Sequence, residues 1–433
     1  MNLHPWGNYS KATYDVHKFE QDLGLLKQIV TANQDIIPFG NGRSYGDSAL
    51  NKKIIHARWH HYFLDFDERK GLLTVQSGVL LSEILDIFVP RGWFLKITPG
   101  TKFITVGGAI ASDVHGKNHH KEGCFSECLA KFSLMLADGA IVGCSRDQNP
   151  ELFHATCGGM GLTGVILDAQ IRLTKIKSQN ISQKTVKTKN LEETFAAFET
   201  YGNDPYSVAW IDCCSKGKHI GRSLLTAGDF CDDGDLAYQP KPNFSVPFYF
   251  PSFVLNKYSA SAFNWAYYHK VKERITRETV DIDTFFYPLD AIQNWNRIYG
   301  RNGFTQYQFV LPKRESFKGM EEIICKISEA GKGSFLAVLK LYGQANANYL
   351  SFPMEGYGLA LDFKVQKGVF ELLDKLDKII LKYNGRIYLA KDVRVKKEVY
   401  EKGYPQIHKF WEIRKRYRMM ERYNSFQSQR VGI

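Results

Sequence analysis

The sequence contains no long apolar run, and several other features are missing with it. Nowhere do about 18 apolar residues follow one another, the length at which a membrane-spanning helix becomes a candidate. Residues 1–9 carry no basic stretch that leads into an apolar one, so we expect no signal peptide. The eight cysteines form no Cys-x-x-Cys pair, which disfavours a zinc site and, without export, favours reduced thiols. These absences predict a cytoplasmic protein without a transmembrane helix.

Acidic residues are scarce relative to basic ones. The chain has 45 Asp and Glu against 57 Lys and Arg, which gives a formal net charge of +12. Such a balance suits nucleic acid, an anionic membrane surface or an anionic substrate. No nucleic-acid-binding motif accompanies the charge, so we expect no nucleic-acid partner and favour an acidic substrate or a lipid surface.

Regular βαβ alternation is missing as well, although 433 residues with 44% hydrophobic content suffice for two or three domains. A helix is expected at 151–157, a strand at 162–173 and a hairpin turn at 137–139. Further short β-type runs in the first third lie at residues 36–39, 72–75, 78–81, 104–110, 131–136 and 140–142. This mixture predicts an α+β fold.

The composition changes near residue 175, where lysine, serine, asparagine and threonine become frequent, and this change marks a domain boundary. Beyond it, strands are expected at 305–311 and 358–363. Apolar residues at helical spacing predict helices at 318–330 and 369–383. Residues 408–423 are a basic, aromatic helix candidate.

The first of three glycine-rich segments follows the β-type run at 36–39. Its residues are Gly40, Asn41, Gly42, Arg43, Ser44, Tyr45, Gly46 and Asp47. Glycines let backbone N–H groups approach and wrap an anion, and a pyrophosphate is a suitable guest. Glycine clusters of this kind also occur in plain surface loops, so both interpretations stand at this point.

The second segment, residues 99–120, combines small residues with three histidines. Its small residues would let a flat ring system and a diphosphate lie directly against the backbone. His115 and His119 are spaced i, i+4, like the zinc-binding pairs of some helices. Gly116 and Asn118 disfavour a helix, however, and no acidic or cysteine ligand completes the set. We therefore predict no metal site.

The third segment contains a GxGxxG pattern at Gly159, Gly161 and Gly164. In a nicotinamide-binding Rossmann site, this pattern follows a strand, opens a helix and precedes an acidic residue by about 20 positions. Here the expected helix comes first and the strand second, and residue 184 is Lys184. We interpret the match as accidental.

Taken together, the three segments resemble the FAD domain of the vanillyl-alcohol oxidase family. The likeness continues at residues 210, 256–258, 287–290, 295–297, 306–310, 339–341, 362–363 and 388–392. Most of these stretches lie in the substrate-binding half. Within the family, they point to oxidation of the 2′-hydroxyl of a polyprenylphosphoryl ribose to a ketone, the first step of an epimerisation to the arabinose form.

The resemblance implies a two-domain PCMH-type FAD-binding fold. Residues 1–176 would form the FAD-binding domain, and residues 177–385 a second α+β domain built on an antiparallel sheet, which binds substrate. Residues 386–433 would return to the FAD domain. The implied substrate-binding residues are Gln308, Lys340, Lys117, Asn256 and Ala360. The implied cofactor-binding residues are Gly40, Asn41, Gly42, Arg43, Ser44, Tyr45, Gly46, Asp47, Gly100, Thr101, Thr105, Gly107, Gly108, Ser112, His115, Gly116, Gly161, Gly164, Ile166 and Tyr388.

Two departures from the family pattern carry information. Members that attach FAD covalently often use a histidine near the first glycine turn, and the stretch Arg43-Ser44-Tyr45 has none. We therefore expect a non-covalent, dissociable FAD. Ala360 stands where relatives can carry a cysteine, two residues before the Asp362-Phe363 pair. A thiol there has no evident part in hydride transfer, so this departure bears on the shape of the substrate pocket.

Oxidation of a secondary alcohol removes a hydride and a proton. FAD supplies the hydride acceptor, so the protein must position the alcohol and take its proton. By resemblance the catalytic candidates are Lys391, Tyr45 and His115. Lys391 would be a base with a pKa lowered by desolvation, a cation that stabilises reduced flavin, or simply a solvated lysine. Tyr45 would be catalytic or would pack over the flavin.

Residues 243–269 are rich in phenylalanine and tyrosine. They would form either core of the second domain or a loop that receives a polyprenyl chain at the bilayer surface. With the basic charge, the second interpretation predicts a lipid-linked sugar phosphate substrate and peripheral contact with the inner membrane. The resemblance further implies a quinone or O₂ as electron acceptor and a partner NAD-dependent reductase.

Two other functions stay open. One is a soluble carbohydrate or alditol oxidase of the same family. The other is a binding protein that kept the fold and lost turnover, against which Tyr45, His115 and Lys391 argue together.

Overall fold

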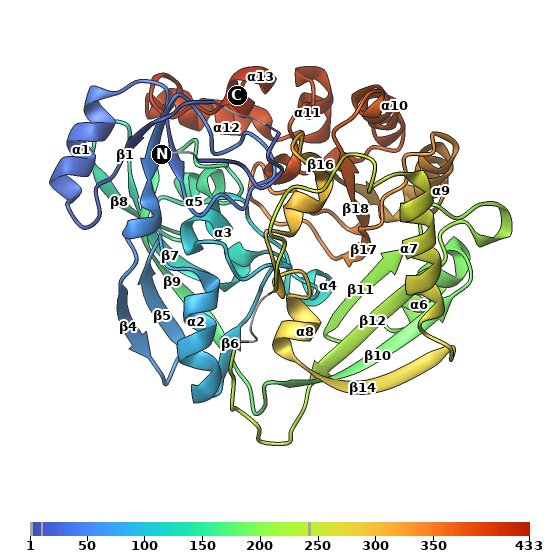
Figure 1. The fold of residues 1–433 in the computed structure, drawn as a ribbon. Helices are drawn as coiled ribbons and strands as arrows, with labels where there is room; N and C mark the ends of the chain where they lie inside the picture. Colours follow the sequence, from blue (N-terminus) through green and yellow to red (C-terminus); the bar gives the residue numbers. More distant parts are fainter. Residues whose placement is uncertain (1–2, 10–11, 241–243) are drawn as a thin grey trace.

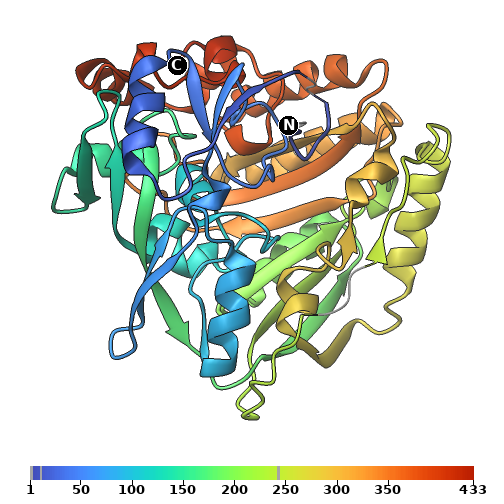
Figure 2. The ribbon, with the colours of Figure 1, turned by 60° about the vertical axis from the view of Figure 1, so that its left-hand side comes forward.

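The computed structural model describes residues 3–9, 12–240 and 244–433, and they form two sheet-based halves side by side. The N-terminal part occupies one half, the middle of the chain forms the other, and the C-terminal helices lie across the first half and reach the second (Figure 1). Figure 2 shows the same division from a second direction, with the long strands of the second half forming a broad curved sheet.

Two sheets build the first half. A small parallel sheet has the order β1-β3-β2, and a six-stranded sheet has the order β4-β5-β9-β7-β8 with β6 paired to β9. The strands are β1 (Asp15–His17), β2 (Ile36–Phe39), β3 (Lys53–His56), β4 (Phe63–Asp67), β5 (Leu72–Gln76), β6 (Trp93–Leu95), β7 (Leu129–Met135), β8 (Ile141–Ser145) and β9 (Val165–Lys175). The helices of this half are α1 (Leu23–Ala32), α2 (Leu81–Phe88), α3 (Val106–Ala111), α4 (His119–Glu122) and α5 (Pro150–Thr156).

Most of the elements expected in this half are present. The hairpin turn at 137–139 joins β7 to β8, and Gly139 adopts the positive φ of 80° that such a turn needs. Helix α5 precedes the GxGxxG pattern and β9 follows it. This order confirms that the pattern is not a Rossmann dinucleotide site.

Two of the expected β-type runs are wrong. Residues 104–110 contribute helix α3, because the Thr105 side chain accepts a hydrogen bond of 3.1 Å from the Gly108 N–H and so caps the helix N-terminus. Residues 78–81 form a turn into α2, where the Glu83 carboxylate accepts from the Leu80 N–H at 2.8 Å. In both places a side-chain cap decided the structure of a segment whose composition suits a strand.

The second half is an eight-stranded antiparallel sheet with the order β14-β10-β12-β11-β17-β18-β16-β19. Its strands are β10 (Asn180–Thr188), β11 (Tyr206–Ile211), β12 (Ser223–Phe230), β14 (Ile275–Asp281), β16 (Phe304–Pro312), β17 (Ala337–Tyr342), β18 (Gly356–Lys364) and β19 (Arg386–Ile387). Together with the first half, it confirms the expected α+β class and the antiparallel sheet of the second domain.

Helices α6 (Leu191–Thr200), α9 (Lys313–Glu329) and α10 (Val369–Lys382) cover one face of this sheet. The expected amphipathic pattern is confirmed in α9, where Met320, Ile323, Ile324 and Ile327 are fully buried. The opposite face of the sheet turns toward the first half. Residues that face the first half are therefore free to line a site between the two halves.

The connection from β12 to β16 contains shorter elements. They are β13 (Phe244–Ser245), α7 (Lys257–His269), α8 (Ile282–Phe286) and β15 (Ile292–Gln293). Helix α7 lies in front of the second half in Figure 1 and at the outer edge of the molecule in Figure 2. Residue 243 of the aromatic stretch lies outside the described residues.

The C-terminal segment contains α11 (Lys397–Gly403), α12 (Ile407–Arg416) and α13 (Phe426–Val431). The helix expected at 408–423 ends earlier, because Arg418 has a φ of +52° that interrupts it. The segment also pairs with the first half. The Asn424 N–H donates to the Ile36 carbonyl at 3.2 Å and the Phe426 N–H to the Leu50 carbonyl at 2.7 Å. The boundaries expected at residues 176 and 385 stay predictions.

Across the part of the chain that the structure describes, no helix combines the length and the apolar character needed to cross a bilayer.

Candidate active site

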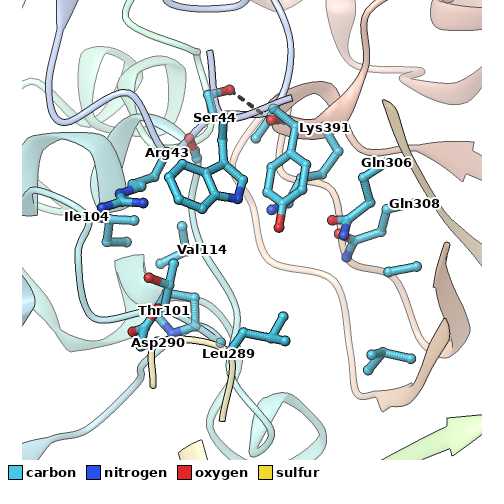
Figure 3. Close-up of a pocket in the computed structure, with 18 of the residues that line it drawn as sticks. Arg43, Ser44, Thr101, Ile104, Val114, Leu289, Asp290, Gln306, Gln308 and Lys391 are labelled. Atoms are coloured by element: carbon cyan, nitrogen blue, oxygen red, sulfur yellow. Dashed lines mark hydrogen bonds between the residues drawn. The ribbon is translucent and has the colours of Figure 1, made fainter. Parts of the chain in front are cut away.

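A cavity of about 930 Å³ lies between the glycine-rich segments of the first half and the inner face of the large sheet. This volume is in the upper range for sites that hold a cofactor or a ligand. In Figure 3, Gln306, Gln308 and Lys391 project into it from one side, and Arg43, Thr101 and Asp290 lie across from them. All three glycine-rich segments found in the sequence reach this single cavity.

The first segment forms the loop between β2 and β3, and the C-terminal segment holds it in place. The Ser44 hydroxyl donates to the Ala390 carbonyl at 2.8 Å, and the Tyr45 N–H donates to the same oxygen at 3.1 Å (Figure 3). A Cβ on Gly46 would lie 1.7 Å from the Asp392 carbonyl oxygen, so only glycine fits there. The loop is therefore rigid on its outer side, while residues 40–46 line the cavity on the inner side.

The second segment supplies open space next to the backbone. A Cβ built on Gly100 would meet no atom within 4 Å, and Gly100 lines the cavity. Most other glycines of the molecule are crowded at that position; for Gly40 the Thr105 hydroxyl is 2.5 Å away. Gly100 thus marks a surface against which a flat group can lie directly.

His115 is held as a neutral imidazole at the end of the cavity. Burial lowers its pKa well below the ordinary value, and the nearby Lys340 lowers it further. The Gln308 amide donates to His115 Nε2 at 3.0 Å, and the Tyr342 hydroxyl lies 3.0 Å from the same nitrogen. The neutral ring then carries its proton on Nδ1, for which no described residue is an acceptor. A buried N–H of this kind favours a bound ligand that accepts it.

Lys391 follows β19 in the short 3₁₀ turn η6 (Leu389–Lys391) and lies half-buried at the cavity wall. Its Nζ atom lies 3.6 Å from the centre of the Tyr45 ring. Burial lowers the pKa of Lys391 to about 7, with Asp362 opposing the shift and Lys340 adding to it. At neutral pH this amine therefore exists in both the charged and the neutral form.

Asp362 in β18 forms a buried network next to Lys391. The Gln306 amide donates to its Oδ1 at 2.6 Å, and the Tyr299 hydroxyl donates to its Oδ2 at 3.2 Å. Burial raises the pKa of Asp362 to about 7, while Gln306 and Lys391 hold it down. Lys391 and Asp362 thus change charge in the same pH range and influence one another.

Two further lysines give this end of the cavity a positive character. Burial lowers the pKa of Lys117 to about 7 and that of Lys340 to about 8. The Lys117 ammonium donates to the Phe285 carbonyl and lies 4.4 Å from the Phe285 ring centre. An anion bound beside them would raise both pKa values and keep both amines charged.

Strand register explains why these residues meet. Gln308 in β16 lies opposite Ala360 in β18, and Ala360 lies opposite Val338 in β17. Because side chains alternate along a strand, Gln306 shares the inner face with Gln308, and Lys340 shares it with Val338. The small Ala360 leaves room between the two glutamines and Lys340.

The structure brings together most of the residues that the sequence predicts for the site. Those that line the cavity are Gly40, Asn41, Gly42, Arg43, Ser44, Tyr45, Gly46, Gly100, Thr101, Thr105, Gly107, Gly108, Ser112, His115, Lys117, Gly161, Gly164, Ile166, Gln308, Lys340, Ala360, Tyr388 and Lys391. Their roles toward a bound group stay predictions.

Three of the expected residues are not among those that line the cavity. Asp47 forms a 2.8 Å ion pair with Arg430. A Cβ on Gly116 would lie 2.8 Å from the Thr98 carbonyl oxygen, so this glycine permits a close approach of the two backbone segments. The Asn256 side chain accepts from the Tyr258 and Ser259 N–H groups and so caps α7. For these three the structure shows a structural role.

Sequence reasoning missed the role of Gln306, Asp362 and Asp290 around the cavity. Gln306 could have been found from its i, i+2 spacing to Gln308 on an expected strand. Burial raises the pKa of Asp290 to about 6, and its Oδ2 accepts from the Lys102 N–H at 2.8 Å. Among the described residues, no group of histidine, cysteine or carboxylate side chains has the arrangement of a metal site.

Comparisons with known proteins agree with this geometry. A family model described as FAD binding domain matches residues 20–145. The decaprenylphosphoryl-beta-D-ribose oxidase of Mycolicibacterium smegmatis is 32% identical over 429 residues, which cover 95% of this chain and 93% of that protein. Human Delta(24)-sterol reductase is 31% identical over 114 residues, 26% of this chain and 22% of that protein. Mouse L-gulonolactone oxidase is 30% identical over 158 residues, 36% of this chain and 35% of that protein.

The fold, the cavity and these matches define an FAD-linked oxidoreductase. The chain belongs to the vanillyl-alcohol oxidase family with a PCMH-type FAD-binding domain, on the branch that includes decaprenylphosphoryl-beta-D-ribose oxidase.

Proposed function

We propose that this enzyme oxidises the 2′-hydroxyl of a polyprenylphosphoryl ribose to a ketone, with a non-covalent FAD. The observation that carries the proposal is the composition of one cavity wall. A titratable amine, Lys391, lies beside hydrogen-bonding amides, Gln306 and Gln308, and the cavity also contains Lys117 and Lys340, whose amines a bound anion would keep charged. This set suits a substrate that is both a polyol and an anion.

The residues present fit FAD. Gly100 offers an open backbone surface, and His115 Nδ1 carries a buried proton without an acceptor among the described residues. Residues 40–46, 100–108, 112–115 and 164–166 would hold the cofactor, and Tyr388 closes the same wall. When bound, FAD supplies the acceptor for the hydride of the alcohol. Residues 43–45 contain no histidine for a covalent link, so a dissociable cofactor is part of the proposal.

The protein's own groups would then handle the sugar. The Lys391 amine, with a pKa of about 7, takes the hydroxyl proton in its neutral form. The Gln306 and Gln308 amides orient the neighbouring hydroxyls, and Lys117 and Lys340 bind the phosphate. Tyr45 fixes the position of the Lys391 ammonium through its ring. The electron acceptor, a quinone or O₂, and a partner NAD-dependent reductase belong to the same proposal.

Substrate screening tests this function directly. The purified protein with FAD is mixed without oxygen with polyprenylphosphoryl ribose, free ribose or an alditol, and the visible flavin absorbance is followed. We expect bleaching by the lipid-phosphate ribose alone. Comparable bleaching by free sugars or alditols would favour a soluble carbohydrate oxidase instead. Acid precipitation of the protein should release the flavin into the supernatant, and a flavin that stays with the pellet would contradict the non-covalent link.

The pH dependence of this reduction should report the Lys391–Asp362 pair. If Lys391 is the base, the rate rises with pH and levels off above its pKa of about 7, because only the neutral amine accepts a proton. Asp362 raises the pKa of Lys391, so Asp362→Asn removes this effect and should move the rising limb to lower pH. The exposed Asp232→Asn is the matched control and should leave the profile unchanged. A rate that falls as pH rises through 7 would instead make Lys391 a charged stabiliser.

A further inference from the structure

Helix α7 is bound to the rest of the molecule by only a narrow stripe. Ala260, Asn264 and Tyr268, spaced four residues apart, are its buried residues. The remaining circumference is open, and it carries Tyr258 with 74% of its surface exposed and Trp265 with 59%. Soluble proteins rarely have a surface helix that is buried on so narrow a stripe and exposes large aromatic rings to solvent.

The segment before α7 continues the same character. Phe244 is 81% exposed, Phe248 62% and Phe253 75%. Half of the exposed large apolar side chains that the described residues present fall within residues 244–292. We call Phe244, Phe248, Phe253, Tyr258 and Trp265 the aromatic rim.

The charged residues along the chain from Phe244 to Arg274 are mostly basic. Between Phe244 and Arg274 the basic residues are Lys257, Lys270, Lys272 and Arg274, and Glu273 is the only acidic one. All four basic side chains belong to exposed residues. Aromatic rings with interspersed lysine and arginine match the interface of a bilayer, where rings enter the headgroup layer and cations meet anionic lipid.

The cavity reaches the same helix from inside. Phe263 and Tyr267 of α7 and Lys270, directly after it, line the cavity, and the Trp210 ring lies 4.8 Å from that of Tyr267. Further along, Val208, Leu224 and Val338 give the sheet face an apolar surface. Although Thr226 and Gln183 also line this face, a mostly apolar passage connects the Lys391 end of the cavity to the helix that carries part of the aromatic rim.

We propose that the aromatic rim and its flanking basic residues dock the enzyme on the surface of an anionic bilayer. Docking places α7 against the headgroups, so that a lipid-linked substrate passes along the apolar sheet face without leaving the membrane surface for water. The docking itself does not depend on which sugar is oxidised. The entry of the substrate's hydrocarbon chain by this route rests on the proposed function.

Co-sedimentation with vesicles tests the docking. The FAD-loaded protein is mixed with phosphatidylcholine vesicles that contain or lack phosphatidylglycerol. We expect binding to the anionic vesicles that weakens at high salt, because lipid headgroups attract the basic residues electrostatically. The triple variant Phe253→Ser, Tyr258→Ser, Trp265→Ser should bind at least about tenfold more weakly. None of these three residues lines the cavity.

A matched triple variant controls for the loss of exposed apolar surface. Trp59, Tyr62 and Leu64 in the first half are 44%, 56% and 51% exposed, and replacing them with serine should leave vesicle binding unchanged. If both triple variants lose vesicle binding equally, or if the rim variant loses none, the assignment of this surface is overturned. Failure of the unaltered protein to bind anionic vesicles would overturn the docking altogether. If the rim variant dissociates an oligomer and vesicles do not bind, the surface is an interface between proteins.

Turnover separates the docking from the proposed function. With a water-soluble, short-chain phosphoryl ribose, the rim variant should match the unaltered protein, whereas with long-chain substrate in vesicles it should be at least about tenfold slower. Vesicle binding that depends on the rim, without turnover of any lipid-linked ribose, would leave the docking in place and contradict the proposed substrate. Equal turnover of vesicle-borne substrate by both proteins would overturn entry through the rim.

Discussion

Replacing Lys391 with alanine should reduce the rate at which substrate bleaches the flavin by about 10²–10⁴-fold, the contribution of a positioned general base. The flavin should stay bound, because Lys391, whose Nζ atom lies beside the Tyr45 ring, does not belong to the glycine-rich segments that would hold the cofactor. The absorption spectrum measures flavin content, thermal unfolding measures stability, and single-turnover kinetics measure the rate of flavin reduction. Reduction at a near-normal rate would remove Lys391 from the mechanism.

Arginine at the same position distinguishes the two roles of Lys391. Arginine keeps the positive charge but does not deprotonate in proteins, so it cannot act as a base. If Lys391 accepts the proton, Lys391→Arg should be as slow as Lys391→Ala. If Lys391 works as a charge, Lys391→Arg should recover most of the rate. The exposed Lys396, 67% accessible in its side chain, is the control for removing a nearby lysine, and Lys396→Ala should behave like the unaltered enzyme.

Replacing Gly100 with leucine should abolish FAD binding while the protein still folds. A Cβ at Gly100 meets no protein atom within 4 Å, so the added side chain does not collide with the core. Because Gly100 lines the cavity, we expect the added side chain to fill space beside the backbone where a flat group would lie. We expect an affinity at least about 1,000-fold lower, equivalent to about 4 kcal/mol. Titration of the flavin-free protein with FAD, followed by fluorescence, gives the dissociation constant.

The control for this substitution is Gly24 in α1. It is also exposed, and the atom nearest to an added Cβ is the Asp22 carboxylate at 3.2 Å. Gly24→Leu should bind FAD normally. Full flavin content in Gly100→Leu would mean that the cofactor lies elsewhere in the cavity, and misfolding of Gly100→Leu would show in its circular dichroism.

The glycine-rich wall of the cavity could be predicted because its residues form three continuous segments. The glycine clusters at 40–46, 100–108 and 158–164 can be recognised in the sequence, because each depends on neighbouring residues only. The strand expected at 104–110 is wrong. Its composition suits a strand, but one hydrogen bond from the Gly108 N–H to the Thr105 side chain starts helix α3 instead. Local sequence patterns thus predict the positions of the loops better than they predict the helices and strands.

The network around Lys391 could not be predicted in the same way. Asp362, Gln306 and Tyr299 meet because β16 and β18 pair in one register, and register depends on the whole sheet. Asn256 lies in a family-like stretch and caps α7, a contact that the stretch alone does not reveal. The sequence of the aromatic stretch allows two interpretations, and the structure divides the stretch between them. Tyr268 is buried, whereas Phe253 and Trp265 are exposed.

The hydrogen bonds between the first glycine loop and the C-terminal segment have a consequence for biosynthesis. Ser44 and its partner Ala390 are separated by 346 positions in the chain. A ribosome that adds roughly 5–20 residues per second makes Ala390 tens of seconds after Ser44. During that interval the loop lacks the carbonyl that fixes it, and Arg430, which pairs with both Asp47 and Asp392, is made later still. The nascent chain therefore fixes this loop of the cavity only when translation is almost finished.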